Sequence, residues 1–125
     1  MTQATKFIVA LAAAVTLYGN CRAGSLSCSG TVEKLVYHQP GNLMIQLSSM
    51  NAPVFICNTD SEWVVPGSLS GNTTVSACKA IYATFLAAKT TRTPLNNLLF
   101  DGDQVPASCT GFTNWLRANV RYYEF

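Results

Sequence analysis

The stretch TVSACKAIYATFLAAK, residues 74–89, has the periodicity of an amphipathic helix. Its apolar stripe recurs every three or four residues: Ala77, Ile81, Phe85 and Ala88. Thr74 stands before the stripe and can cap the N-terminus of the helix. The sequence TTRTP at residues 90–94 ends it, because proline cannot continue a helix. One helix is therefore predicted here, with strand-like segments on both sides of it.

The segments around this helix are rich in β-branched and aromatic residues and are separated by turn residues. Strands are expected at residues 30–38, 43–47 and 54–57 before the helix, and at residues 95–100 and 115–125 after it. The sequence QPGN at residues 39–42 is typical of a turn, so the first two strands are expected to form a hairpin. Residues 24–29, GSLSCS, are small and polar and are predicted to be a loose start.

Three strands, one helix and two further strands is the element order of the five-stranded Greek-key barrel called the OB-fold. The expected fold class is α+β, mainly β: an OB-fold-like barrel over residues 24–125, with one helix between strands 3 and 4. Other α+β arrangements share this order and stay open. The loop at residues 58–73 is longer than most connections, so we expect it to be functional or held by a crosslink.

Residues 1–23 have the pattern of a secretory signal peptide. Lys6 precedes an apolar run at residues 7–18, FIVALAAAVTLY, and small residues follow it. This run is shorter than the ~20 apolar residues that span a bilayer. We therefore expect cleavage after Ala23, export to the periplasm or the medium, and no membrane span. Cleavage before Cys21, as in a lipoprotein, is disfavoured by Asn20 in front of it.

The charge balance argues against nucleic acid as a partner. The full chain has a formal net charge of +2, and residues 1–23 hold two of its eight Lys and Arg side chains. Without them, six cations balance six anions. A neutral surface releases no counterions when it meets a phosphate backbone, so it lacks the term that drives such binding.

Four cysteines follow the predicted cleavage site: Cys28, Cys57, Cys78 and Cys109. An even number in a small exported domain is typical of a disulfide framework. Their spacing leaves all three connectivities open. Zinc is the competing use of such cysteines, but the chain has no Cys-x-x-Cys pair and a single histidine, so no metal site is expected.

Two short motifs flank the long loop: Val54-Phe55-Ile56-Cys57 and Val75-Ser76-Ala77-Cys78. They resemble the receptor-binding B subunits of bacterial AB5 toxins, especially those of subtilase cytotoxin and the pertussis-like typhoid toxin. From Cys28-Ser29-Gly30 to its aromatic end, the chain is similar to small exported OB-fold-like proteins of Gram-negative bacteria. The resemblance implies a Cys57–Cys78 disulfide and thereby a Cys28–Cys109 disulfide, although the toxin subunits have their second bridge near the C-terminus.

No combination of residues predicts catalysis, so no catalytic residue and no cofactor are expected. His38 lies where a strand meets a turn, which favours an ordinary surface histidine over a general base. Asp60 and Glu62 are interpreted as solvated charges in a polar loop. Asp101-Gly102-Asp103 is interpreted as a turn, because calcium needs six or more oxygen ligands. A non-enzymatic protein is the prediction.

A binding site is expected in the long loop, at Trp63 with the polar residues Asn58, Asp60 and Asn72. An indole ring can stack on the C–H face of a sugar while amide and hydroxyl side chains bind its hydroxyls. The alternative interpretation, which is favoured for Trp63 itself, is that its ring turns inward and covers the core. The predicted function is recognition of a glycan or cell-surface ligand. The alternative is a periplasmic protein-interaction module, such as a hydrolase inhibitor or an envelope-complex subunit.

The C-terminal segment carries four aromatic side chains: Trp115, Tyr122, Tyr123 and Phe125. A terminal strand with apolar residues on both faces has two possible uses. One face packs in the core while the other meets a second copy of the chain, or the whole segment packs in the core. The first use predicts a homo-oligomer, since an exposed apolar strand is otherwise prone to aggregation.

Overall fold

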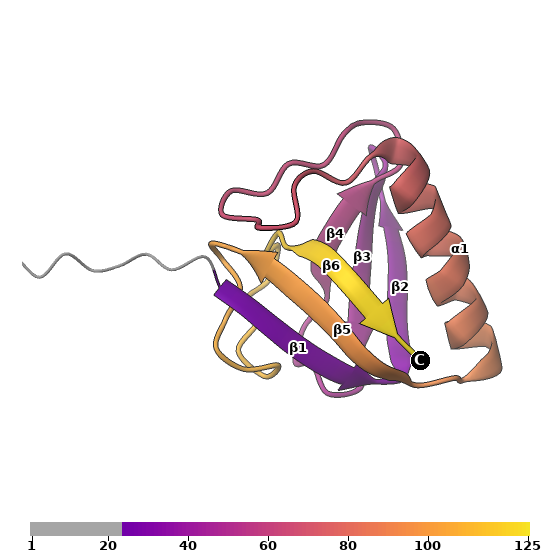
Figure 1. The fold of residues 1–125 in the computed structure, drawn as a ribbon. Coiled ribbons are helices and arrows are strands. Elements are labelled where there is room, and N and C mark those ends of the chain that lie inside the picture. The colour runs from indigo at the N-terminus through magenta and orange to yellow at the C-terminus, as the bar shows by residue number, and fades with distance from the viewer. Residues whose placement is uncertain (1–23) are drawn as a thin grey trace, which may run out of the picture.

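The computed structural model describes residues 24–125 (Figure 1). The predicted signal peptide, residues 1–23, lies outside the described residues. The elements, in chain order, are β1 (Gly24–Gly30), β2 (Val32–His38), β3 (Asn42–Leu47), β4 (Val54–Asn58), α1 (Val75–Thr91), β5 (Leu95–Gly102) and β6 (Asn119–Glu124). No helix in this part of the chain is long and apolar enough to cross a membrane.

The strands form two antiparallel three-stranded sheets, one ordered β1-β5-β6 and the other β2-β3-β4 (Figure 1). The predicted five-stranded OB-fold-like barrel is therefore wrong. Residues 24–125 contain six strands and no closed barrel, and the helix follows the fourth strand instead of the third. The predicted hairpin does form, because β2 pairs with β3 from Val32↔Leu47 to His38↔Asn42.

The additional strand is β1, in a segment that the sequence predicts to be a loose start. Its sequence, GSLSCSG, consists mostly of glycine and serine, which have little strand preference of their own. It becomes a strand because it pairs with β5, with Leu26 opposite Phe100 and Cys28 opposite Leu98. A disulfide from Cys28 to Cys109, with Cα atoms 5.9 Å apart, fastens it further. Both partners lie far along the chain, where a local sequence pattern cannot show them.

Gly30 marks the point where the chain leaves one sheet for the other. Its φ of 127° is disfavoured for any residue with a side chain, and a Cβ there would collide with the Ser48 hydroxyl. The single strand expected at residues 30–38 is therefore replaced by β1 and β2, which belong to different sheets.

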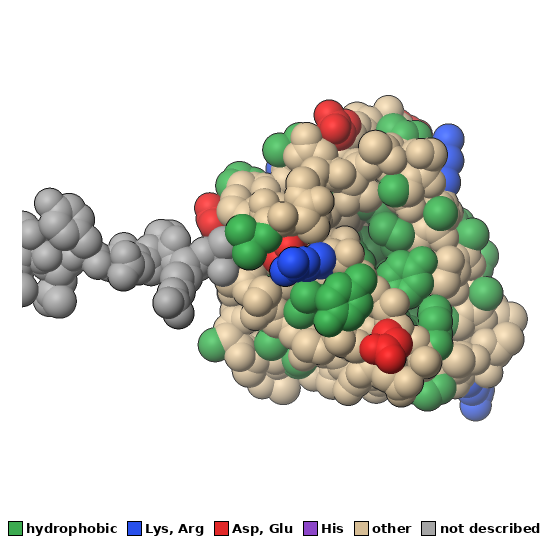
Figure 2. Space-filling model, viewed as in Figure 1, with side chains coloured by type: hydrophobic (Ala, Val, Ile, Leu, Met, Phe, Trp, Pro, Cys, Tyr) green, Lys and Arg blue, Asp and Glu red, His purple; other side chains and the backbone are tan. Residues whose placement is uncertain are grey.

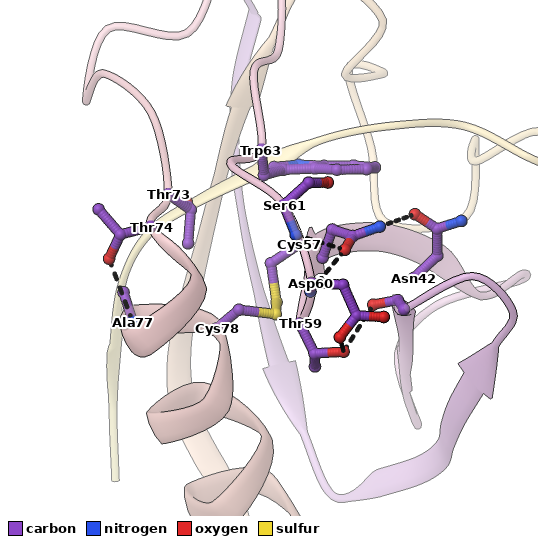
Figure 3. Close-up of a disulfide and its surroundings, with 12 residues drawn as sticks. Asn42, Cys57, Thr59, Asp60, Ser61, Trp63, Thr73, Thr74, Ala77 and Cys78 are labelled. Atoms are coloured by element: carbon purple, nitrogen blue, oxygen red, sulfur yellow. Dashed lines mark hydrogen bonds between the residues drawn. A yellow bond between two sulfur atoms is a disulfide. The ribbon is translucent and has the colours of Figure 1, made fainter.

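Helix α1 begins where the sequence predicts. The Thr74 side chain accepts a hydrogen bond from the Ala77 backbone N–H at 3.2 Å (Figure 3). The helix ends at Arg92, which has a left-handed backbone with a φ of 55°. Its buried face consists of Cys78, Ile81, Phe85 and Ala88. Cys78 thus takes the inward position that the predicted stripe gave to Ala77, and a disulfide joins it to Cys57 in β4 with Cα atoms 5.6 Å apart.

A continuous core lies between the two sheets and α1. Its largest fully buried apolar side chains come from the helix and from three strands, β3, β4 and β5: Phe85, Phe100, Leu43, Ile45, Leu47, Ile56, Leu95, Leu98 and Val54. The aromatic C-terminal segment divides between core and surface. Tyr123 packs on Phe85 with ring centroids 5.0 Å apart, whereas about half of the Tyr122 and Phe125 surfaces is exposed, at 49% and 46%.

Removing either disulfide should destabilise the protein, and the two losses should differ. A crosslink limits the unfolded chain more when it closes a longer loop. The sequence separations of 21 and 81 residues correspond to losses of about 3 kcal/mol for Cys57→Ala/Cys78→Ala and about 4.5 kcal/mol for Cys28→Ala/Cys109→Ala. Urea unfolding of the two double variants measures both free energies. A larger loss for the Cys57–Cys78 pair would contradict this expectation.

Candidate functional site

An open cleft of about 320 Å³ lies beside the turn that follows β4. Its walls come from the start of β3, from β4, from the long loop (residues 59–74) and from the segment that precedes β6. The lining residues are Asn42, Phe55, Asn58, Ser61, Glu62, Trp63, Trp115 and Arg117.

Main-chain pairing with β4 forms one wall of this cleft. The Phe55 N–H donates to the Leu116 carbonyl at 3.0 Å, and the Ala118 N–H donates to the Phe55 carbonyl at 2.9 Å. Residues 116–118 therefore lie beside β4 and pair with it in parallel over a short length, with Arg117 opposite Phe55. This pairing brings Trp115 and Arg117 next to residues that lie about sixty positions earlier in the chain.

Trp63 is buried, with 4% of its surface exposed. Its indole Nε1–H donates to the Ala118 carbonyl at 3.0 Å. The Arg117 guanidinium carbon lies 4.0 Å from the centroid of the Trp63 ring, a cation–π arrangement. The Trp63 ring therefore points inward and closes one end of the cleft, and it offers no open face for stacking.

Asn58 organises the turn, because its side-chain amide bonds to neighbouring groups of the protein. Its Nδ2 donates to the Pro40 carbonyl and to Asn42 Oδ1, both at 2.9 Å. Its Oδ1 accepts from the backbone N–H groups of Asp60, at 2.8 Å, and Ser61, at 3.0 Å. Asn58 thus fixes the backbone at Ser61 and the side chain of Asn42. The amide nitrogen of Asn42 points away from Asn58 (Figure 3).

The other two predicted site residues lie at different distances from the cleft. Asp60 is exposed on the same turn and accepts a bond from the Thr59 hydroxyl at 3.3 Å. Asn72 donates to Glu62 Oε1 at 3.2 Å but lines a separate hollow between β6 and α1. The structure therefore brings Trp63 and Asn58 to one cleft, places Asp60 beside them, and excludes Asn72.

The predicted binding set lacks most of the cleft residues, and the most exposed apolar one among them is Trp115. Its side chain is 64% exposed, and its backbone has a φ of 65°. A bulky residue in this left-handed region is uncommon and costs on the order of 1–3 kcal/mol. The ring packs against His38 and Phe55, with centroids 5.3 Å and 5.7 Å away. The sequence pattern predicts a strand at Trp115, and no spacing signal marks a left-handed position there.

The cleft offers both hydrogen-bond donors and acceptors around its aromatic rings. Arg117 and Glu62 are exposed and carry opposite charges, while Asn42 and Ser61 add an amide and a hydroxyl. Arg117 is oriented by its Nη2, which donates to the Val64 carbonyl at 3.4 Å. Between Gly24 and Phe125, no group of three or more His, Cys, Asp and Glu side chains could hold a metal ion. The amide, hydroxyl, carboxylate and guanidinium groups of the cleft can bond to a neutral ligand that carries several hydroxyls.

The long loop is closed at its base and fastened at its tip. Trp63 and Thr73 exchange two backbone hydrogen bonds, of 2.9 and 3.0 Å, and the Cys57–Cys78 disulfide joins the elements on either side. At the tip, the fully buried Asp101 carboxylate accepts from the Ser68 and Ser70 hydroxyls, each at 3.0 Å. Asp101 of the predicted DGD turn therefore anchors the loop, whereas Asp103 is exposed.

Asn119 extends this anchor from the neighbouring strand. It lies opposite Asp101 in the β5–β6 pair and is 2% exposed. Its Nδ2 donates to Ser68 Oγ, Ser70 Oγ and the Gly71 carbonyl at 2.8–2.9 Å, and its Oδ1 accepts from the Thr73 hydroxyl at 2.6 Å. Every polar atom of the Asn119 side chain is thus bonded to the long loop.

Comparisons with known proteins found no family model, no curated protein and no solved structure that matches this chain.

The buried carboxylate leads to a stability prediction. Asp101→Ala removes the carboxylate that accepts from the Ser68 and Ser70 hydroxyls, so the free energy of unfolding should fall by about 1–3 kcal/mol. Backbone amides of the long loop should also exchange hydrogen faster. The matched control is Asp103→Ala on the exposed turn nearby, which should change stability by less than about 0.5 kcal/mol. Equal losses in the two variants would show that the network does not anchor the loop.

Proposed function

We propose that this protein is a non-enzymatic binding module that recognises a saccharide of a cell surface in the cleft beside Trp115. The observation that carries the proposal is the Trp115 ring, which is 64% exposed although its backbone is held in a strained conformation. Strained residues persist where the surrounding structure enforces them, and they cluster at ligand-binding sites.

The surroundings of Trp115 favour a sugar over other small ligands. Aromatic side chains have a polarised ring face and a large apolar area, so a pyranose can lay its C–H face against the indole. The Asn42 amide, the Ser61 hydroxyl, the Glu62 carboxylate and the Arg117 guanidinium then lie within the same cleft for its hydroxyls. A few convergent polar groups beside an apolar surface are typical of small-molecule sites.

The two disulfides fit an exported protein, since such bonds persist in oxidising compartments. Under this proposal residues 1–23 are removed, and residues 24–125 act as one domain in the periplasm or outside the cell.

A second candidate function, protein interaction, is favoured by β6. This strand pairs with β5 on one side only, so its other edge offers free backbone hydrogen-bonding groups. Beside that edge lies a hollow of about 250 Å³ with a mixed polar and apolar lining, and its apolar and aromatic residues include Ala77, Ile81 and Tyr123. Figure 2 shows hydrophobic side chains gathered along this hollow between β6 and α1. A strand from a partner protein or from a second copy of the chain would fit this edge, the second case giving a homo-oligomer.

A glycan array followed by titration of the bound saccharide tests the main proposal. Trp115→Ala should weaken saccharide binding by about tenfold or more, because the stacking surface is lost. Its free energy of unfolding should stay within about 1 kcal/mol of the parent value, since the ring is largely exposed.

The matched control is Tyr82→Ala, which removes an exposed aromatic ring on α1 away from the cleft and should leave binding unchanged. An array with no bound saccharide, or full binding by the Trp115→Ala variant, would refute the proposal. In that outcome, mixing with candidate partner proteins and a native mass measurement would test the β6 edge.

A further inference from the structure

A second hollow, of about 420 Å³, lies on the other side of Trp115. Its lining residues are Lys34, Val36, Met44, Pro53, Asn114 and Trp115. Trp115 lines both this hollow and the polar cleft, so its exposed ring is the wall that the two spaces share. A ligand larger than one sugar ring that contacts Trp115 therefore has a second space within its reach.

The pairing of β2 with β3 places this second hollow on the outer face of their sheet. Val36 lies opposite Met44, and paired residues point to the same face. Leu43 and Ile45, the residues on either side of Met44, are fully buried in the core. Because neighbouring residues of a strand point to opposite faces, Val36 and Met44 lie on the other face of the sheet from Leu43 and Ile45. Met44 is 7% exposed and packs with the buried apolar residues, and Val36 is partly buried against them. The other lining residues Lys34, Asn114 and Trp115 are exposed, so the hollow opens at the surface.

The two spaces differ in chemistry. The cleft presents an amide, a hydroxyl, a carboxylate and a guanidinium, whereas the floor of the second hollow is formed by Val36, Met44 and Pro53. Lys34 adds its aliphatic stem to the apolar wall while its ammonium can stay in water. One side of Trp115 therefore suits hydroxyls, and the other suits hydrocarbon.

We infer that the ligand of this site is a saccharide linked to an alkyl chain, as in the head-group region of a glycolipid. The sugar ring occupies the polar cleft, and the first carbons of the chain cross the edge of Trp115 into the second hollow. This inference rests on the proposed saccharide binding and names the aglycone that goes with it. An alkyl group is favoured over an aromatic one because the apolar lining other than Trp115 is aliphatic, and because Met44 has a flexible side chain that adapts to a chain of variable shape.

Paired glycosides test this inference. Methyl and octyl β-glucosides, β-galactosides and α-mannosides are titrated against the oxidised protein, below the concentration at which the octyl compounds form micelles. Each methylene that becomes buried raises affinity about fourfold. At least one octyl glycoside should therefore bind at least about tenfold more tightly than its methyl partner. Trp115→Ala should weaken the binding of both.

Val36→Thr separates the second hollow from the first. The change keeps the β-branched shape and places a hydroxyl in the apolar wall, so the octyl-to-methyl affinity ratio should fall by about fivefold or more. Methyl glycoside binding should not change. The matched control is the same substitution at an exposed valine outside both spaces, Val64→Thr, which should preserve the ratio.

The other outcomes are distinct. Equal affinity for methyl and octyl compounds, with Trp115 still required, would overturn the alkyl inference and leave the saccharide proposal standing. Octyl binding that persists in Trp115→Ala would indicate nonspecific adsorption and would overturn the inference too. No binding by any of the six compounds would overturn the inference, and the glycan array would then decide the saccharide proposal separately.

Discussion

The cleft depends on one short backbone pairing, between Phe55 in β4 and the segment at residues 116–118. Two hydrogen bonds, of 3.0 and 2.9 Å, connect them in parallel. Residue 118 is followed directly by β6, which belongs to the other sheet, so the same pairing sets how the two sheets meet. The Ala118 carbonyl also accepts the indole N–H of Trp63. A shift of this register would move Trp115 and Arg117 and unseat Trp63 at once.

The long loop shows how a chain of this size holds an extended segment without giving it regular structure. The disulfide next to its base limits the unfolded chain, and the network at its tip acts on the folded state. That network includes a fully buried carboxylate, and such a group costs several kcal/mol to desolvate unless hydrogen bonds compensate. The Ser68 and Ser70 hydroxyls supply those bonds, and the Asn119 amide donates to both hydroxyls. The loop can then carry Trp63 into the core as a rigid unit.

The backbone conformation of Trp115 costs free energy, and its exposed ring is the proposed ligand contact. Its left-handed backbone is unfavourable for a bulky side chain, and packing against His38 and Phe55 returns only part of the apolar burial that an inward tryptophan would gain. A backbone cost of this kind is expected where an exposed side chain binds a ligand. The Trp115 ring, between the polar cleft and the second hollow, has such a position.

Local residue patterns determined the helix with its Thr74 cap, the hairpin of β2 and β3, and the strands near residues 54–57 and 95–100, because each depends on neighbours a few positions away. Only the tertiary structure decided that GSLSCSG is a strand, that the strands divide into two sheets, and that Trp115 rather than Asn72 lies at the cleft. Those features come from contacts between residues sixty or more positions apart, such as Leu26 with Phe100 and Phe55 with Arg117. A periodicity of two or of three to four residues carries no information about such contacts, since pairing energy depends on which distant edge is available.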